Sequence, residues 1–380
     1  MSQKILLALS GGIDSSTTAY LLKKKNLELS AVYIKFYASN QKQKEIINQE
    51  SMVAKKIAQS LNIPFFILDF SKEQKKWVID YLLNTYQEGY TPNPCIVCNK
   101  LLKFGRLLDW AKARGFSQLA TGHYAQIIDK SAQLYLASAK DQSKDQSYFL
   151  YQLEEKKLAE ILFPLGSLSK TEVKNLAKKA NLPYLDRESF DICFLKDSSL
   201  RQFLKENLQE NPGEIVEQNG LVIGKHRGLA FYTIGQRRGL NINHQALKKS
   251  QTINYSKNQP PALLVLDKIS KDNRLVVAEK QDCFVNEFLV RDLHFINRSQ
   301  EKLWEEKDHF YGLVKIRNLG KLISCQLKRK EKQILVKTKE KVFAPAGGQS
   351  AVFYQESKDN LLVIGGAIID NEAVKALSSD

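Results

Sequence analysis

The 380-residue chain lacks any long apolar run, and it has few cysteines. No segment approaches the roughly 18 consecutive apolar residues of a membrane span, and no secretory leader precedes the first apolar run. We therefore expect a cytoplasmic protein without a membrane partner. Five cysteines, an odd number, do not indicate a disulfide framework in a chain of this length. In a reducing compartment, such thiols are more often buried, metal-bound or catalytic.

Acidic residues are in the minority. The chain has 57 Lys and Arg against 41 Asp and Glu, a formal net charge of +16. This excess favours a polyanionic partner such as a nucleic acid, although a solvated basic surface would have the same composition. Residues 311–341 hold ten basic and two acidic side chains, which is half of the net charge. This segment is either a solvated strand face or a contact surface for phosphates.

The first half of the chain alternates between two patterns. Continuous apolar runs separated by helical patterns predict a parallel sheet that is covered on both faces. Residues 169–172, Ser-Lys-Thr-Glu, predict a further helix that begins with a capping box. The predicted strands are 5–9, 31–37, 64–70 and 118–125, and the predicted helices are 15–25, 45–61, 72–87 and 100–114.

The pattern changes after Asn-Pro-Gly at residues 211–213. Short β-like runs follow one another without a long amphipathic helix, which predicts an all-β barrel or sandwich. We expect an α/β domain at 1–205, a small β-rich domain at 206–280 with a polar insertion at 243–261, and a C-terminal β-barrel at 281–380. The β-like runs are 214–217, 221–223, 263–266, 274–277, 310–316 and 333–338.

A loop rich in glycine and serine, Ser-Gly-Gly-Ile-Asp-Ser-Ser at residues 10–16, follows the first strand and opens a helix. Free amides and a positive dipole end favour anions at this position, and glycines let a phosphate approach the backbone. Asp14 cannot attract phosphate itself, so we expect it to bind a phosphate-bound Mg²⁺. The loop lacks the Gly-Lys-Ser/Thr ending of γ-phosphate transferases. A glycine turn capped by serines is the alternative interpretation.

Cys95 and Cys98 form a C-x-x-C pair just before a predicted helix. A thiolate is stabilised near a helix N-terminus, so we expect a low pKa for Cys98. A structural zinc site would need further ligands, and only the distant Cys193 and His123 could supply them. The pair could also be a redox pair, and Cys193 could be a buried packing residue. The two cysteines of the second half are assigned to packing.

The loop at residues 10–15 resembles that of the PP-loop ATP pyrophosphatase superfamily, whose members adenylate a carbonyl oxygen and release pyrophosphate. Other motifs resemble the tRNA-specific 2-thiouridylase family more specifically, and they follow that family's order over nearly the whole chain. They are Thr-Pro-Asn-Pro-Cys-Ile-Val-Cys-Asn at 91–99, Ala-Thr-Gly-His-Tyr at 120–124, Lys-Asp-Gln-Ser-Tyr-Phe-Leu at 144–150, Ile-Cys-Phe at 192–194, Thr-Ile-Gly-Gln-Arg-Arg-Gly-Leu at 233–240, and a Pro, Gly-Gln and Val-Phe-Tyr stretch within 345–354.

This resemblance implies ATP-dependent 2-thiolation of the wobble uridine, position 34, of tRNA. The carbon-2 oxygen would be adenylated, and sulfur from a cysteine persulfide would replace it with release of AMP and pyrophosphate. Cys193 would carry the persulfide, and Cys98 would either attack the base or release sulfide by forming a disulfide with Cys193. The implied partners are ATP with Mg²⁺, tRNAs of the Lys, Glu and Gln type, and a persulfide donor, either a cysteine desulfurase or a relay protein. No permanently bound metal is implied.

The resemblance also implies which residues bind each partner. For ATP these are Ala8, Leu9, Ser10, Gly11, Gly12, Ile13, Asp14, Ser15, Ile34 and Gly122. For the target base they are Asn93, Pro94 and Cys95. For tRNA they are His123, Lys144, Asp145, Gln146, Arg317, Asn318 and Gln349.

The chain departs from the family's pattern at three places. The loop Ala-Pro-Ala-Gly-Gly-Gln at 344–349 is two residues longer than the family's Ala-Pro-Gly-Gln. Ile34 replaces a methionine but still offers an apolar wall to adenine, and Cys95 stands where many relatives have Asp.

Two alternatives to this function are a PP-loop thiolase that acts at another tRNA position and a non-catalytic tRNA-binding protein. The intact loop together with Cys98 and Cys193 argues against the second alternative.

Overall fold

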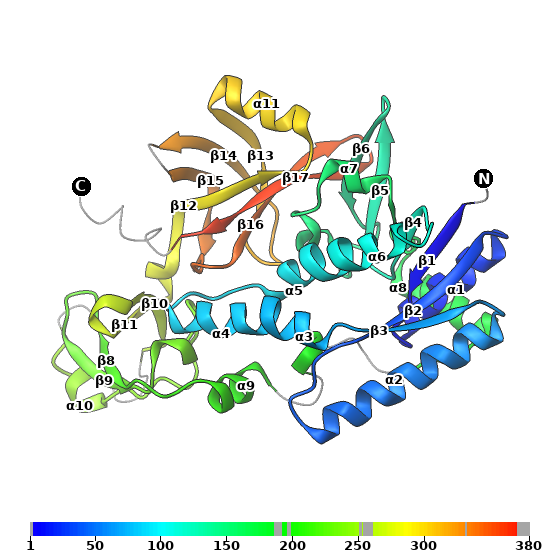
Figure 1. Cartoon of the computed structure of the whole chain (residues 1–380). Coiled ribbons are helices and arrows are strands. Elements are labelled where there is room, and N and C mark those ends of the chain that lie inside the picture. The colour runs from blue at the N-terminus through cyan, green and yellow to red at the C-terminus, as the bar shows by residue number, and fades with distance from the viewer. Residues whose placement is uncertain are drawn as a thin grey trace.

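The computed structural model describes residues 3–185, 192–195, 199–250, 253, 261–330 and 333–370. The chain forms three parts that pack against one another (Figure 1). A parallel α/β part contains the N-terminus, a small mixed part lies at the lower left of the view, and a barrel lies above them. No helix in the described part is both long and apolar enough to cross a membrane.

The first part has a five-stranded parallel sheet in the order β3-β2-β1-β4-β7, which confirms the predicted sheet. Its central strand is apolar because helices cover both faces, and Leu6 and Leu7 are fully buried. The strands are β1 (Lys4–Ala8), β2 (Glu28–Lys35), β3 (Phe65–Asp69), β4 (Gln118–Ala120) and β7 (Ile161–Leu162). The helices around them are α1 (Ile13–Lys24), α2 (Gln41–Ser60), α3 (Ser71–Gln74), η1 (Lys75–Ile79), α4 (Asp80–Gln87), α5 (Pro94–Val97), η2 (Cys98–Leu107), α6 (Leu108–Lys112), η3 (Ser147–Leu150), α7 (Glu155–Leu158), α8 (Lys170–Ala180) and η4 (Cys193–Leu195).

Two helix starts show how local chemistry sets the boundaries. The predicted capping box before α8 is present: the Ser169 hydroxyl accepts from the Glu172 amide, and the Glu172 carboxylate accepts from the Ser169 amide. The predicted helix at 100–114 begins earlier, at Pro94, because proline is favoured in the first helical turn. Helices α5, η2 and α6 then follow without interruption, and η2 has the wide turns of a π-helix.

The middle part is a four-stranded sheet in the order β10-β11-β8-β9. Strands β11 and β8 run parallel, and the other pairs are antiparallel. Of the polar insertion at 243–261, the structure describes 243–250, 253 and 261, with a short helix capped by the Asn243 side chain. The elements are α9 (Leu200–Asn207), β8 (Gly213–Val216), β9 (Val222–His226), η5 (Leu229–Phe231), α10 (His244–Leu247), β10 (Leu263–Ile269), η6 (Ser270–Asp272), β11 (Arg274–Glu279) and η7 (Lys280–Cys283).

The third part is a closed barrel, as predicted. Its six strands follow the order β12-β15-β14-β13-β16-β17, and β12 also pairs with β17. The β5–β6 hairpin of the first part extends this sheet, because Ala137 of β6 pairs with Leu362 of β17. The elements are β5 (Ala125–Lys130), β6 (Gln133–Ser138), β12 (Phe284–Phe295), β13 (His309–Lys315), β14 (Ile323–Lys330), β15 (Gln333–Phe343), β16 (Ser350–Ser357) and β17 (Asn360–Ile369).

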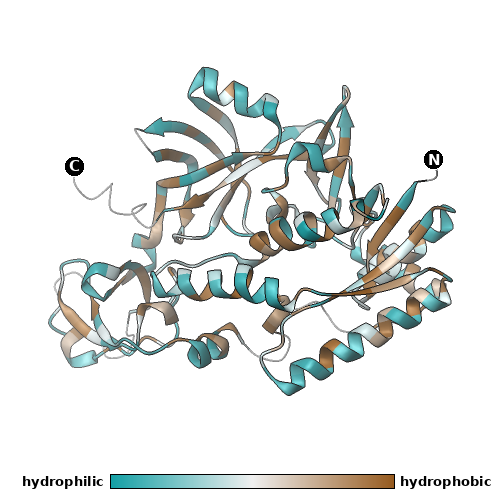
Figure 2. Cartoon of the chain, viewed as in Figure 1, coloured by the Kyte–Doolittle hydropathy of each residue, from teal (hydrophilic) through white to brown (hydrophobic). Residues whose placement is uncertain are grey.

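The expectation of an all-β second half is wrong in one respect, because helix α11 (Arg298–Lys307) lies between β12 and β13 in the chain and packs against both strands. Only Trp304 of this helix is buried, and its ring packs against Phe295. Figure 2 shows the rest of α11 as largely hydrophilic. A helix that buries one side chain has almost no apolar stripe, so the sequence pattern does not reveal it.

A buried ion pair joins the first part to the barrel. The Lys315 ammonium lies 3.4 Å from an Asp145 carboxylate oxygen, and these side chains are 6% and 1% exposed. The same carboxylate accepts hydrogen bonds from the Ala139 amide and from Ser147. Buried polar groups are stable when they are paired and hydrogen-bonded, so the pair fixes the barrel against the first part.

Candidate active site

The phosphate loop has the predicted position between β1 and α1. Gly11 has φ +83°, and a Cβ there would lie 2.9 Å from the Glu50 carbonyl oxygen, so both its conformation and its surroundings require glycine. The Ser10 and Ser15 hydroxyls lie 3.1 Å apart, and the Ser10 amide donates to the Ser15 hydroxyl. The serines thus bring their hydroxyls together over the start of the helix, where an anion would bind.

Gly122 follows β4 and Ile34 belongs to β2, the two strands that pair with β1. A Cβ at Gly122 would lie 3.0 Å from the Ser15 amide nitrogen, so the backbone after β4 lies directly against the start of α1. Ile34 lies near the carboxyl end of β2 and packs, partly buried, against the core. Both residues therefore lie at the edge of the sheet where ligands of open α/β folds bind.

Asp14 has two partners that are not evident from the sequence, Lys170 and Tyr124. The Lys170 ammonium lies 2.5 Å from Asp14 Oδ1, and the Tyr124 hydroxyl donates to the same oxygen at 2.8 Å. Burial and the Asp14 charge raise the pKa of Tyr124 well above its ordinary value, so it remains a donor. Lys170 is the first residue of α8, and only its position after a capping Ser169 could have drawn attention to it.

The thiols of Cys98 and Cys193 lie within hydrogen-bonding reach of each other. Cys98 is 4% exposed and belongs to η2, whereas Cys193 is half-buried in η4. The buried Gln74 amide donates to the Cys193 sulfur at 3.7 Å, and its oxygen accepts from the Tyr37 amide. The structure thus brings together the two cysteines that were predicted to react, and Gln74 orients the second of them.

The expected low pKa of Cys98 is wrong for this arrangement. The Cys193 thiol and burial raise the pKa of Cys98 well above its ordinary value, and only the Lys103 ammonium opposes this increase. Because the helix begins at Pro94, Cys98 lies in its second turn, where the helix dipole has weakened. The neighbouring Cys193 thiol and the burial together outweigh the Lys103 charge, so Cys98 is a thiol at neutral pH.

Lys103 also links the cysteines to the ATP side of the site. Its ammonium lies 3.3 Å from His123 Nε2, and His123 Nδ1 lies 2.8 Å from the Thr121 hydroxyl. Burial and the Lys103 charge lower the pKa of His123 well below its ordinary value. The imidazole is therefore neutral, with Nε2 as the acceptor for Lys103 and the proton on Nδ1.

The longer loop at 344–349 places Gln349 beside the predicted target-base residues. The Gln349 amide donates to the Thr91 carbonyl at 2.9 Å and to the Pro92 carbonyl at 3.3 Å. The Thr91 amide donates to the Gly347 carbonyl at 2.8 Å. The extra residues thus form a close contact with the chain directly before Asn93, and the barrel meets the first part at this point.

The other residues predicted to contact tRNA differ in accessibility. Arg317 is exposed and Lys144 is partly exposed, whereas Gln146 exchanges hydrogen bonds with the Tyr124 backbone. Asp145 is 1% exposed and is bound to Lys315, so its carboxylate does not face outward in this structure. The Asn318 side-chain oxygen is buried and has no hydrogen-bond partner among the described residues.

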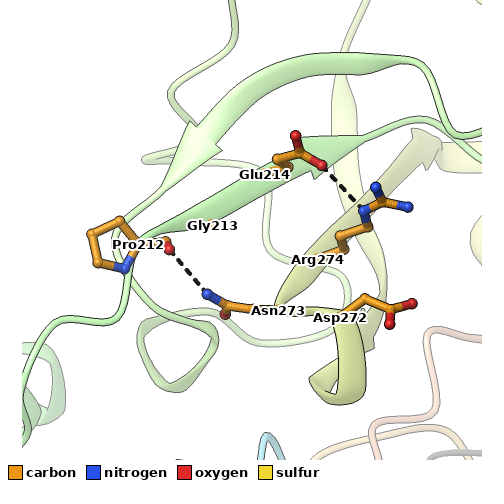
Figure 3. Close-up of a pocket in the computed structure, with 6 residues that line it drawn as sticks. All are labelled: Pro212, Gly213, Glu214, Asp272, Asn273 and Arg274. Carbon is orange, nitrogen blue, oxygen red and sulfur yellow. Dashed lines mark hydrogen bonds and ion pairs between the residues drawn. The ribbon is translucent and has the colours of Figure 1, made fainter.

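A separate hollow of about 550 Å³ lies on the middle part (Figure 3). Its Glu214 carboxylate is paired with Arg274 at 3.1 Å, and the Asn273 amide donates to the Pro212 carbonyl. These polar groups bind each other, and the hollow contains none of the predicted site residues.

In the described part of the chain, no group of three or more His, Cys, Asp or Glu side chains is arranged to hold a metal ion.

A phosphate loop at the edge of a parallel sheet, with two adjacent thiols, defines a PP-loop enzyme. Family models match the chain in three segments: the tRNA methyl transferase HUP domain at residues 3–197, the tRNA methyl transferase PRC-barrel domain at 201–279 and the aminomethyltransferase beta-barrel domain at 285–369. The tRNA-specific 2-thiouridylase MnmA 1 of Fusobacterium nucleatum is 38% identical over 370 residues, 96% of this chain and 93% of the relative. The tRNA-specific 2-thiouridylase MnmA of Helicobacter pylori is 37% identical over 371 residues, 96% of this chain and all of the relative. The chain belongs to the tRNA-specific 2-thiouridylase family, whose members are sulfurtransferases.

Similarity to solved structures is weaker. The U34-tRNA thiolase NcsA from Methanococcus maripaludis, solved with its [4Fe-4S] cluster, matches 54% of this chain and 66% of its own length. The TM-score is 0.33 at 20% identity, which is too low to support an argument about the site.

Proposed function

We propose that this enzyme thiolates carbon 2 of the wobble uridine, position 34, of tRNA in an ATP-dependent reaction. The observation that carries the proposal is the contact between the Cys98 and Cys193 thiols. Lys103, whose charge acts on Cys98, also binds His123. The residue before His123, Gly122, lies against the phosphate loop. A site for nucleotide activation and a pair of sulfur-transfer groups are thus adjacent, as a replacement of oxygen by sulfur requires.

The ATP-binding residues proposed are 8–15, with Ile34 and Gly122 near the adenine. The target base lies between Asn93, Pro94 and Cys95, and it must leave the base stack because a stacked base hides carbon 2. Adenylation of the carbon-2 oxygen makes it a leaving group, and pyrophosphate is released. Lys170 and the α1 amides stabilise the phosphate charges in this step.

The residues present fit a phosphate-bound Mg²⁺. The Tyr124 hydroxyl and the Lys170 ammonium both bind Oδ1 of Asp14, and no described residue donates a hydrogen bond to Oδ2. A carboxylate that can offer one oxygen is the usual protein ligand of Mg²⁺ bound to a nucleotide. When bound, the ion would neutralise charge on the phosphates, and Asp14 would hold it on the α1 side of the loop.

Cys193 accepts a persulfide sulfur from a donor, either a cysteine desulfurase or a relay protein. In one route, the Cys98 thiolate attacks Cys193 Sγ, the bond to the outer sulfur breaks, and hydrosulfide leaves as a Cys98–Cys193 disulfide forms. Hydrosulfide then attacks carbon 2 and AMP leaves. In the other route, Cys98 Sγ attacks carbon 2 first and AMP leaves. The outer persulfide sulfur of Cys193 then displaces Cys98 from carbon 2, and the freed Cys98 thiolate attacks Cys193 Sγ, which breaks the S–S bond, leaves the outer sulfur on carbon 2 and forms the disulfide. An external thiol reductant returns the disulfide to two thiols.

The experiment that tests this proposal measures sulfur incorporation. Purified enzyme is incubated with ATP, Mg²⁺, a persulfide donor and unmodified tRNAs of the Lys, Glu and Gln type, and the nucleosides are analysed by mass spectrometry. We expect exchange of one oxygen for sulfur at position 34, with AMP and pyrophosphate formed in equal amounts. Sulfur at another position, or incorporation without ATP, would contradict the proposal.

A further inference from the structure

The motif at residues 233–240 has no role in the site described above, yet it presents two exposed arginines, Arg237 and Arg238. Neither side chain makes an ion pair or a hydrogen bond with any described residue. Elsewhere most arginines are paired, for example Arg227 with Glu210 and Arg329 with Asp308. Exposed arginines without internal partners are available for a ligand.

The backbone of this segment, which we call the arginine loop, is held in one conformation. Gly235 and Gly239 have φ of +82° and +81°, which favours glycine at both positions. The Gln236 side chain accepts from the Thr233 amide at 3.1 Å and donates to the Arg238 carbonyl at 2.9 Å. The loop therefore presents its arginines from a preformed frame, which lowers the entropy cost of binding.

The arginine loop lies where the middle part meets the barrel. A Cβ at Gly235 would lie 3.0 Å from Ala344 Cβ, so the two backbones are in close contact. Arg317 donates to the Ala344 carbonyl at 2.9 Å, and its guanidinium lies 5.6 Å from the Phe343 ring centre. On the other side, the Arg201 guanidinium lies 3.6 Å from where a Cβ of Gly239 would be. Arginines from three elements thus gather around one junction.

This junction is continuous with the target-base side of the site. The chain leads from Ala344 through Gly347 to Gln349, and this segment binds the carbonyls and amide of Thr91 and Pro92. Asn93, proposed to contact the target base, is the next residue. An anionic polymer whose base lies at Asn93 would therefore extend toward the arginine loop.

We propose that the arginine loop binds backbone phosphates of the tRNA next to the target base, with Arg237 and Arg238 as the principal contacts and Arg201 and Arg317 beside them. This inference rests on the proposed function. The planar guanidinium forms two parallel hydrogen bonds to a phosphate, which explains arginine rather than lysine at both positions. These contacts set the register of the tRNA and carry no sequence preference.

The test compares the double variant Arg237→Gln/Arg238→Gln with the matched control Lys248→Gln/Lys249→Gln. The control removes the same charge from two exposed residues of the same middle part. The Kd for unmodified tRNA is measured by fluorescence anisotropy over a range of KCl concentrations. Each lost phosphate contact lowers the slope of log Kd against log salt by about 0.7–0.9. We expect a decrease of about 1.5 in the arginine variant, at least tenfold weaker binding at low salt, and neither change in the control.

A second variant, Arg237→Lys/Arg238→Lys, keeps the charge and guards against misfolding of the first. It should keep the salt slope and bind more weakly than wild type, because lysine makes a single contact. An unchanged salt slope and tRNA affinity in a folded Arg237→Gln/Arg238→Gln variant would overturn the inference. The same holds if that variant binds tRNA normally and loses binding only to an acidic protein that donates the persulfide. A wild-type enzyme that binds tRNA with the expected salt slope but does not thiolate it would refute the proposed function and leave this inference intact.

Discussion

The Cys98 thiol lies within hydrogen-bonding reach of the Cys193 thiol, although the two residues belong to separate helices, η2 and η4. The contact disfavours the thiolate of Cys98, because the Cys193 thiol raises the pKa of Cys98 and burial adds to that increase. Cys98 therefore rests as a thiol at neutral pH in this arrangement.

The first prediction concerns this cysteine pair. After one turnover without reductant, peptide mapping should find a disulfide between Cys98 and Cys193 and none that includes Cys95, Cys283 or Cys325. The variants Cys98→Ser and Cys193→Ser should lose thiolation and keep tRNA-dependent pyrophosphate release, because a hydroxyl cannot carry or release persulfide sulfur. Full thiolation by Cys193→Ser with a physiological persulfide donor would refute the two-cysteine scheme.

The second prediction concerns Lys103 and pH. Because the pKa of Cys98 is raised, its thiolate fraction and its alkylation rate should increase as the pH increases above neutrality. Removing the ammonium in Lys103→Met should move this profile to a still higher pH and slow alkylation severalfold at neutral pH. Lys100→Met, an exposed lysine of the same helix, is the control and should leave the profile unchanged. A Lys103→Met profile that coincides with wild type would show that the ammonium does not act on Cys98.

The third prediction concerns Asp14 and Lys170. Asp14→Ala and Lys170→Met should each reduce pyrophosphate release by about 10²- to 10³-fold, because each removes a charge placed for the phosphates or their metal. The Kd for tRNA should change less than about threefold, since neither residue is proposed to contact tRNA. Lys174→Met, on the exposed side of the same helix α8, should retain full activity. If either variant lost tRNA affinity to the same extent as pyrophosphate release, the role of Asp14 and Lys170 at the phosphates would be refuted.

The fourth prediction concerns the ion pair between Lys315 and Asp145. Lys315→Met should lower the free energy of unfolding by about 3–5 kcal/mol, because it leaves a buried carboxylate without its counter-charge. Lys337→Met removes the exposed pair with Glu287 and should cost only about 0–1 kcal/mol. Urea unfolding of both variants gives the comparison. Equal effects of the two substitutions would mean that solvent reaches Asp145 despite its burial.

The phosphate loop and the two cysteines that lie together, Cys98 and Cys193, could be predicted from the sequence because each belongs to a short motif. The glycine at residue 11, which has φ +83°, and the Ser169 cap of α8 are visible in the order of residues. Helix α11 escaped prediction because it buries only Trp304. The helix that contains Cys98 was predicted to begin at residue 100 and instead begins at Pro94, because proline is typical of loops as well as of the first helical turn.

The sequence by itself determined the class of fold, the position of the phosphate loop and the family to which the chain belongs. Only the tertiary structure decided the pKa of Cys98, since desolvation and the Cys193 thiol depend on residues far away in the chain. The same is true of Asp145, which pairs with Lys315 of the barrel, and of the junction between Gly235 and Ala344. Periodicity and capping act within a few residues, whereas burial and charge pairing are set by whichever segments the fold brings together.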